Sequence, residues 1–169
     1  MSNLTSRAYY KARVLLVPLG ASGQELVESM AQEGLREVSV AMPAGQKEGA
    51  LVHDIEREDH ATVTLSDLTG ATDMMVFIGS KLDDVADSFV QSMSAAGREQ
   101  GTLIAGLFVD IGGWNTEPGS TSMKVIRHEM DMMITVRKAD LALAFIEVIK
   151  GGSEKGGTPG DLFTSEVSA

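Results

Sequence analysis

Short apolar runs alternate along this chain with segments of helical periodicity, and this alternation restricts the fold more than any other feature. The first unit is the clearest. The run Val14-Leu15-Leu16-Val17 is followed by a glycine-containing turn, an amphipathic segment over residues 24–33 and a second short run at 38–42. A strand, a helix and a strand in this order form a βαβ unit, in which the strands are parallel and the crossover is right-handed.

The same alternation continues to residue 150. Two later runs, at 74–78 and 103–109, are continuously apolar, as is typical of parallel strands buried on both faces. The other expected elements are strands at 61–65 and 132–136, and helices over 66–72, 82–99, 122–131 and 139–150. The sequence therefore predicts a three-layer α/β domain with a mostly parallel sheet.

The length of 169 residues is that of a single domain. We expect the folded domain to span residues 12–150. A polar arm at 1–11 precedes it. A tail at 151–169, rich in Gly, Ser and Thr, follows it and is expected to be flexible.

Charge and composition exclude several classes of function. Fourteen Lys and Arg against 24 Asp and Glu give a net charge of -10, which disfavours nucleic acid and anionic membranes as partners. The absence of cysteine excludes disulfides, thiolate metal sites and thiol nucleophiles. We find no secretory signal at the start and no apolar stretch long enough to span a bilayer. The expected location is the cytoplasm.

Two glycine turns that follow strands are the candidate binding sites for a nucleotide. Their candidate residues are Gly20, Ser22, Gly23, Gln24, Gly79 and Ser80. Amide groups at a helix N-terminus bind anions, so a turn of this kind can hold a phosphate. The favoured interpretation is structural, however, because turns between strands and helices need glycine in any α/β protein.

Acidic and histidine side chains are the weaker candidates. Asp83, Asp84 and Asp87 could hold Mg²⁺ or Ca²⁺, but carboxylates also complement the dipole of a first helical turn, and that interpretation is favoured. The pairs His53-Asp54 and Asp59-His60 could serve acid–base or metal chemistry, but surface positions in a loop are favoured. His128 precedes Asp131 by three residues, which predicts a side-chain pair on a helix.

Several segments together resemble the FtsZ branch of the tubulin superfamily. Residues 72–78 and 101–109 resemble its "ADMVF" and "GALTVGVV" strands, and residues 122–136 resemble its "KHVDSLITI" segment. Residues 140–151 align with its purine-contacting helix, and Gly23-Gln24 with its first glycine loop. The resemblance covers most of residues 13–151. It implies the Rossmann-like nucleotide-domain topology of a filament-forming GTPase.

The positions that matter for GTP depart from that family. Its glycine-rich phosphate loop falls on residues 82–88, where there is no glycine and three aspartates stand instead. A glycine cradle lets amides approach the anion, and carboxylates repel it by about 4 kcal/mol per pair ~4 Å apart at intermediate dielectric. The aromatic base platform falls on Ala142 and the base-binding polar residue on Ile146. The domain that carries the family's catalytic acidic loop has no counterpart in these residues.

Three hypotheses for function follow. The leading one is an FtsZ-like domain that has lost GTP hydrolysis and acts as a protein-interaction or assembly module, with itself or another protein as partner. It implies no cofactor, and self-association is supported by the methionines of 74–75 and 123–133 and by the filaments of the resembled family. The second is residual GTP or GDP binding by the first glycine turn. The third is an enzyme on a flavodoxin-like scaffold, with its site at 18–23, 79–81 and 110–114, near Trp114.

Overall fold

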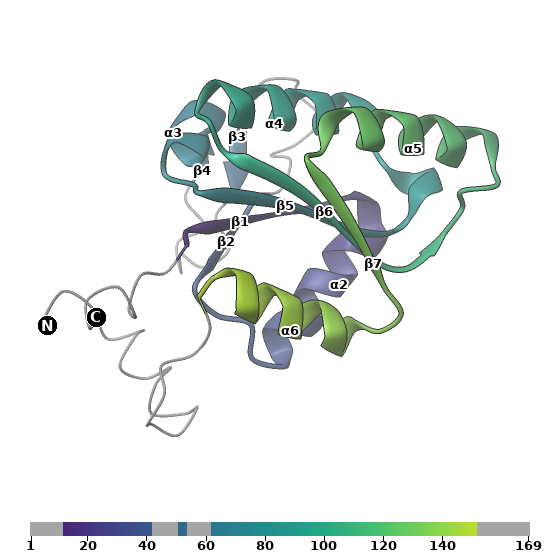
Figure 1. The fold of residues 1–169 in the computed structure, drawn as a ribbon, viewed down its shortest axis with the longest axis horizontal. Coiled ribbons are helices and arrows are strands. Elements are labelled where there is room, and N and C mark those ends of the chain that lie inside the picture. The colour runs from purple at the N-terminus through teal and green to yellow at the C-terminus, as the bar shows by residue number, and fades with distance from the viewer. Residues whose placement is uncertain (1–11, 42–50, 54–61, 152–169) are drawn as a thin grey trace, which may run out of the picture.

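The computed structural model describes residues 12–41, 51–53 and 62–151 (Figure 1). Within them, a five-stranded sheet has the order β2-β1-β5-β6-β7, and every neighbouring pair is parallel. The strands are β1 (Val14–Pro18), β2 (Val38–Val40), β5 (Met74–Lys81), β6 (Leu103–Gly112) and β7 (Met132–Val136). The predicted α/β class with a mostly parallel sheet is confirmed.

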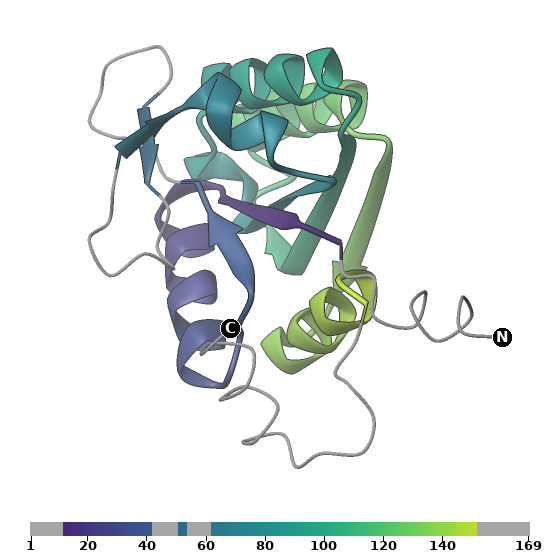
Figure 2. The ribbon, with the colours of Figure 1, turned by 90° about the vertical axis from the view of Figure 1, so that its left-hand side faces the viewer.

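Helices cover both faces of this sheet, as Figures 1 and 2 show. On one face lie α2 (Gly20–Gln32) and α6 (Ala139–Ile149), and on the other lie α4 (Asp87–Glu99) and α5 (Glu117–Glu129). Each face has its own buried apolar cluster, one including Val27, Met30 and Ile146 and the other Val90, Met93 and Ile126. The predicted three layers are therefore present.

Strand β5 lies at the centre and shows why its sequence is an unbroken apolar run. Met75, Val76, Phe77 and Ile78 are all fully buried. Alternate side chains point to opposite faces, so Val76 and Ile78 join the cluster under α2 and α6, whereas Met75 and Phe77 join the one under α4 and α5. A strand that is covered on both sides has no polar face.

The predicted helix over 82–99 is wrong in its first turns. Strand β5 continues to Lys81, a 3₁₀ turn η1 covers Leu82–Asp84, and α4 begins only at Asp87. Val85 and Ala86, between them, have extended backbone dihedrals. Asp83 and Asp84 therefore belong to a separate turn and not to the start of a helix.

Helix α5 begins earlier than the expected start at Ser122. Thr116 is its N-cap, and the Thr116 hydroxyl accepts a hydrogen bond of 3.1 Å from the amide of Gly119. Pro118 lies in the first turn, where proline is favoured because the missing amide has no helical partner there. The helix therefore starts at Glu117, within the glycine- and proline-containing stretch that precedes Ser122.

A small hairpin lies apart from the main sheet. Strand β4 (Thr62–Thr64), within the run predicted at 61–65, pairs antiparallel with β3 (Leu51–His53), and the short helix α3 (Leu65–Gly70) follows. The other histidine and acidic candidates of this region, Asp54, Asp59 and His60, lie outside the described residues, as do the arm at 1–11 and the tail from 152 onward. None of the helices in the described ranges is long and apolar enough to cross a membrane.

The ends of α4 and α5 are joined by an ion pair. Arg98 Nη2 lies 2.6 Å from Glu129 Oε2 and donates a 2.7 Å hydrogen bond to the Glu129 carbonyl. His128 Nδ1 lies 3.4 Å from the other carboxylate oxygen of Glu129. The predicted pairing of His128 with Asp131 is therefore wrong. Asp131 instead accepts a 2.8 Å bond from the amide of Ile104, because the helix has ended before it.

The Glu129 pair makes stability depend on pH. Burial alone would raise the pKa of the Glu129 carboxyl, but the bonds from Arg98 and His128 outweigh it, so the pKa is lower than its ordinary value of 4.5. A lowered folded pKa gives stability that is present above the ordinary value and is lost as the pH falls through the folded value. We expect Glu129→Gln to lower the free energy of unfolding at pH 7 by only about 1 kcal/mol, because Arg98 is half exposed.

Urea unfolding of the wild type and Glu129→Gln between pH 7 and pH 3 tests this. The difference between the two proteins should be largest at neutral pH and should shrink as the pH falls below about 4.5. Glu99→Gln is the matched control, since Glu99 is exposed one residue beyond Arg98 and should leave the profile unchanged. A constant difference across this pH range would contradict the prediction.

Candidate functional site

The candidate site lies where the strand order reverses. From β1 the chain passes through α2 to β2 on one side, whereas β5, β6 and β7 follow one another on the other side. In open α/β sheets, ligands bind outside the carboxyl ends of the strands at such a point. Pro18 is paired with Ile78, and Lys81 with Gly112, so the ends of β1, β5 and β6 meet at one edge. The three segments predicted for the third hypothesis are therefore brought together.

The N-terminus of α2 at this edge is capped by a distant carboxylate. The N-cap residue, Leu19, has no polar side chain. Asp84 of η1 takes the capping role, because its Oδ2 accepts from the amide of Ser22 at 3.2 Å and its Oδ1 from the Ser22 hydroxyl at 3.3 Å. The Ser22 Oγ in turn accepts a 3.2 Å bond from the amide of Lys81. A carboxylate thus occupies the place that a phosphate would take at a helix N-terminus.

Gly20 is required by this arrangement in two ways. Its φ of +66° lies in the left-handed region that glycine tolerates best. A Cβ at this position would also clash with Asp84 Oδ1. The absence of a side chain here therefore serves the approach of the protein's own carboxylate.

Gly23 has a different purpose, which is close packing of α2 on the sheet. A Cβ on Gly23 would lie 2.6 Å from the carbonyl oxygen of Ile78 and 3.1 Å from the carbonyl carbon of Pro18. Gly23 is buried on the side of α2 that faces β1 and β5. This supports the structural interpretation of the first glycine turn at that position.

The remaining predicted turn residues make few polar contacts. Gln24 is half-buried in the second turn of α2. Ser80 Oγ is 3.5 Å from the carbonyl of Asp110. A Cβ on Gly79 would meet Leu19 and Phe108 only at ordinary distances of 3.4 Å or more, so glycine is not required there.

The three aspartates face three different neighbours and do not form a cluster. Asp84 caps α2, whereas Asp83 lies against the loop after β6, where a Cβ on Gly113 would be 2.7 Å from its Oδ1. Asp87 accepts a 2.6 Å bond from the Ser122 hydroxyl and so ties α4 to α5. Only Asp87 lies in the first turn of α4. Within the described ranges, no group of three or more metal-binding side chains is assembled.

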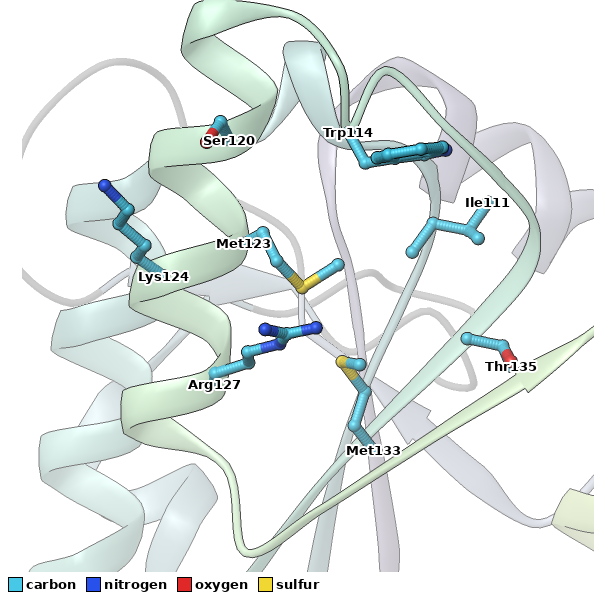
Figure 3. Close-up of a pocket in the computed structure, with 8 residues that line it drawn as sticks. All are labelled: Ile111, Trp114, Ser120, Met123, Lys124, Arg127, Met133 and Thr135. Atoms are coloured by element: carbon cyan, nitrogen blue, oxygen red, sulfur yellow. The ribbon is translucent and has the colours of Figure 1, made fainter.

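A hollow lies beside the edge strand β7, between that strand and α5. Its volume is about 440 Å³. It is lined by Ile111, Trp114, Ser120, Met123, Lys124, Arg127, Met133 and Thr135 (Figure 3). We call it the β7 groove. Trp114 is 63 % exposed, and the Arg127 guanidinium points toward the space between Met123 and Met133.

Sequence reasoning selected Trp114 but missed the cation of the β7 groove. Arg127 has no hydrogen bond or ion pair with any residue that the structure describes. Its position five residues before the predicted strand at 132–136 gives no sign that α5 folds back over that strand. Only the packing of α5 on the sheet brings Arg127 into the same groove as Trp114.

Compared with protein-family models and with curated proteins, the sequence gives no match.

Proposed function

We propose that this chain is a protein-interaction or assembly module built on an FtsZ-like domain whose phosphate position is closed by its own Asp84. The observation that carries the proposal is the Asp84 carboxylate on the amide and hydroxyl of Ser22. Its partner is a second copy of the chain or another protein. The domain performs no GTP hydrolysis.

The closed position opposes phosphate on both steric and electrostatic grounds. A phosphate at the start of α2 must first displace Asp84 from Ser22 and then remain beside Asp83 and Asp84, both of which are exposed at that edge. Two unit negative charges ~4 Å apart repel by about 4 kcal/mol at an intermediate dielectric. This repulsion exceeds the net gain of about 1.5–3 kcal/mol from one charge-assisted hydrogen bond.

Thermal unfolding with and without GTP, GDP, ATP and FMN, each with Mg²⁺, tests the closed site. A ligand at 100 times its Kd would add about 2.7 kcal/mol of stability and raise the melting temperature measurably. We expect no rise with any of the four. A rise with GTP or GDP would overturn the closed-site proposal in favour of residual nucleotide binding.

Removing the Asp84 carboxylate should open the phosphate position at the start of α2. We expect Asp84→Ala to lower the free energy of unfolding by about 1 kcal/mol, the usual effect of losing an N-cap. Inorganic phosphate, compared with chloride at equal ionic strength, should then stabilise Asp84→Ala more than the wild type. Asp83→Ala is the matched control, because it removes the same charge from the same turn but leaves the cap. Equal responses of the two variants would argue against Asp84 as the group that fills the site.

A second candidate is a small-ligand enzyme on a flavodoxin-like scaffold. The sheet order β2-β1-β5-β6-β7 favours this candidate. When the five strands are numbered along the chain, their order is 2-1-3-4-5, which is the order of the flavodoxin-like fold. Fold alone does not give activity. FMN is included in the thermal test for this reason, and a rise with FMN alone would favour this candidate.

A further inference from the structure

The β7 groove differs in charge from the rest of the molecule. The chain has a net charge of -10, yet the lining of the groove includes Lys124 and Arg127 and no carboxylate. Trp114, Met123 and Met133 give it large apolar and polarisable walls. A cationic, aromatic and methionine-lined groove suits a segment that combines carboxylates with apolar side chains.

The edge of β7 beside the groove is open to a further strand. The sheet ends at β7, and no strand in the described ranges pairs with its outer side. The strand sequence Met-Met-Ile-Thr-Val contains no charge and no proline, which are the usual means of protecting a sheet edge. An extended peptide can therefore add its backbone to β7 and place alternate side chains in the groove.

One segment of the chain outside the described residues has the matching composition. Residues 161–167 read Asp-Leu-Phe-Thr-Ser-Glu-Val and follow a glycine-rich stretch at 152–160. In an extended strand, Asp161, Phe163 and Val167 share one side. A carboxylate and two apolar side chains would then face Arg127 and the walls of the groove together.

We propose that the β7 groove binds residues 161–167 of a second copy of this chain as an added strand, with Phe163 between the methionines and Asp161 at Arg127. The inference rests on the proposed assembly function, for which it names the surface and the partner. It does not depend on the state of the α2 N-terminus.

The place where the tail leaves the domain indicates that the segment in the groove comes from a second copy and not from the same molecule. Lys150 accepts a bond from the amide of Ala12, just before β1, and its Nζ reaches the carbonyl of Arg36, just before β2. The tail thus begins at the β1–β2 side of the sheet on the α2–α6 face, whereas the groove lies at β7 on the α5 face. A flexible glycine-rich linker of nine residues, the length of 152–160, typically spans only about 17 Å. Three strand spacings alone are about 14 Å, before the path around the sheet edge is added.

The single tryptophan of the chain reports directly on this groove. A synthetic peptide of residues 159–169 contains no tryptophan, so its titration into dilute protein can be followed by Trp114 emission. We expect a saturable change with this peptide and none with a scrambled one. Arg127→Glu should weaken binding by about tenfold or more, the effect of losing a central interface residue. The Arg127→Glu protein should bind the peptide that carries Asp161→Lys more tightly than it binds the wild-type peptide.

Sedimentation velocity of the full chain tests the same contact between copies. We expect the average mass of the wild type to rise with concentration, and Phe163→Ser and Arg127→Glu each to shift the association to about tenfold higher concentration. The double variant Asp161→Lys/Arg127→Glu should regain association, which a merely destabilised protein would not do. A wild type that stays monomeric overturns the proposal. So does a Trp114 signal that depends on Phe163 but not on concentration, because the tail would then bind its own molecule.

The two proposals fail in different experiments. A melting temperature raised by GTP would overturn the closed phosphate position and leave the peptide titration unaffected. Self-association that Phe163→Ser and Arg127→Glu do not change would overturn the β7 groove as the interface, while the assembly function itself would stand.

Discussion

Replacing Lys150 by methionine is expected to lower the free energy of unfolding by about 3 kcal/mol, the lower end of the range for breaking a buried ion pair. The Lys150 side chain is only 2 % exposed. Its Nζ donates to the carbonyl of Arg36 at 2.6 Å and lies 2.9 Å from Glu147 Oε1 and 3.9 Å from Glu37 Oε2. Methionine fills the same space but leaves the Arg36 carbonyl without this donor and removes the cation beside Glu147.

Urea or thermal unfolding measures the loss. For a chain of this length, about 3 kcal/mol corresponds to a fall in melting temperature of roughly 6–12 °C. Lys138→Met is the matched control, since Lys138 is exposed at the other end of α6 and should change stability by less than about 0.5 kcal/mol. If Lys150→Met unfolds like the control, the ammonium does not hold α6 to the segment after α2.

Gly23→Ala is expected to destabilise the protein by about 3 kcal/mol, at the upper end of the range for overpacking. The added Cβ would lie 2.6 Å from the backbone oxygen of Ile78, and a backbone atom of a central strand has little room to move. The helix must therefore shift away from the sheet. Gly79→Ala is the matched control, because its Cβ would meet neighbours at 3.4 Å or more, and we expect a change below about 1 kcal/mol.

This pair of variants also separates the two interpretations of the glycine turns. If Gly23 served only the approach of a ligand, its replacement would leave the stability of the unliganded protein almost unchanged. A large loss for Gly23→Ala and a small one for Gly79→Ala, measured by urea unfolding, is the result expected from packing. Equal and small losses would contradict the packing role of Gly23.

The strands were predictable from the sequence because burial on both faces leaves a local signature. The runs at 14–17 and 74–78 contain no polar residue at all, and a parallel sheet between two helical layers requires this. The layers followed from the alternation of such runs with helical segments. Local patterns of this kind need no knowledge of which distant residues meet.

The site was only partly predictable, because its contacts join residues far apart in the chain. Asp84 and Ser22 are 62 residues apart, and nothing in either segment marks them as partners. The first turns of the segment at 82–99 kept a helical pattern although Val85 and Ala86 are extended. Arg127 was missed for the same reason, since the β7 groove exists only once α5 lies over the sheet edge. The likeness to a GTPase family concerned mainly apolar segments, which carry the fold and not the chemistry.

The Asp84 cap has one consequence for how such a protein is controlled. If the cap excludes nucleotides as we propose, the response of the domain would be the same at high and at low cellular GTP. Under that proposal, hydrolysis of a bound triphosphate would not time the contacts of the domain, and the protein concentration and the ionic strength would set how much of it is engaged.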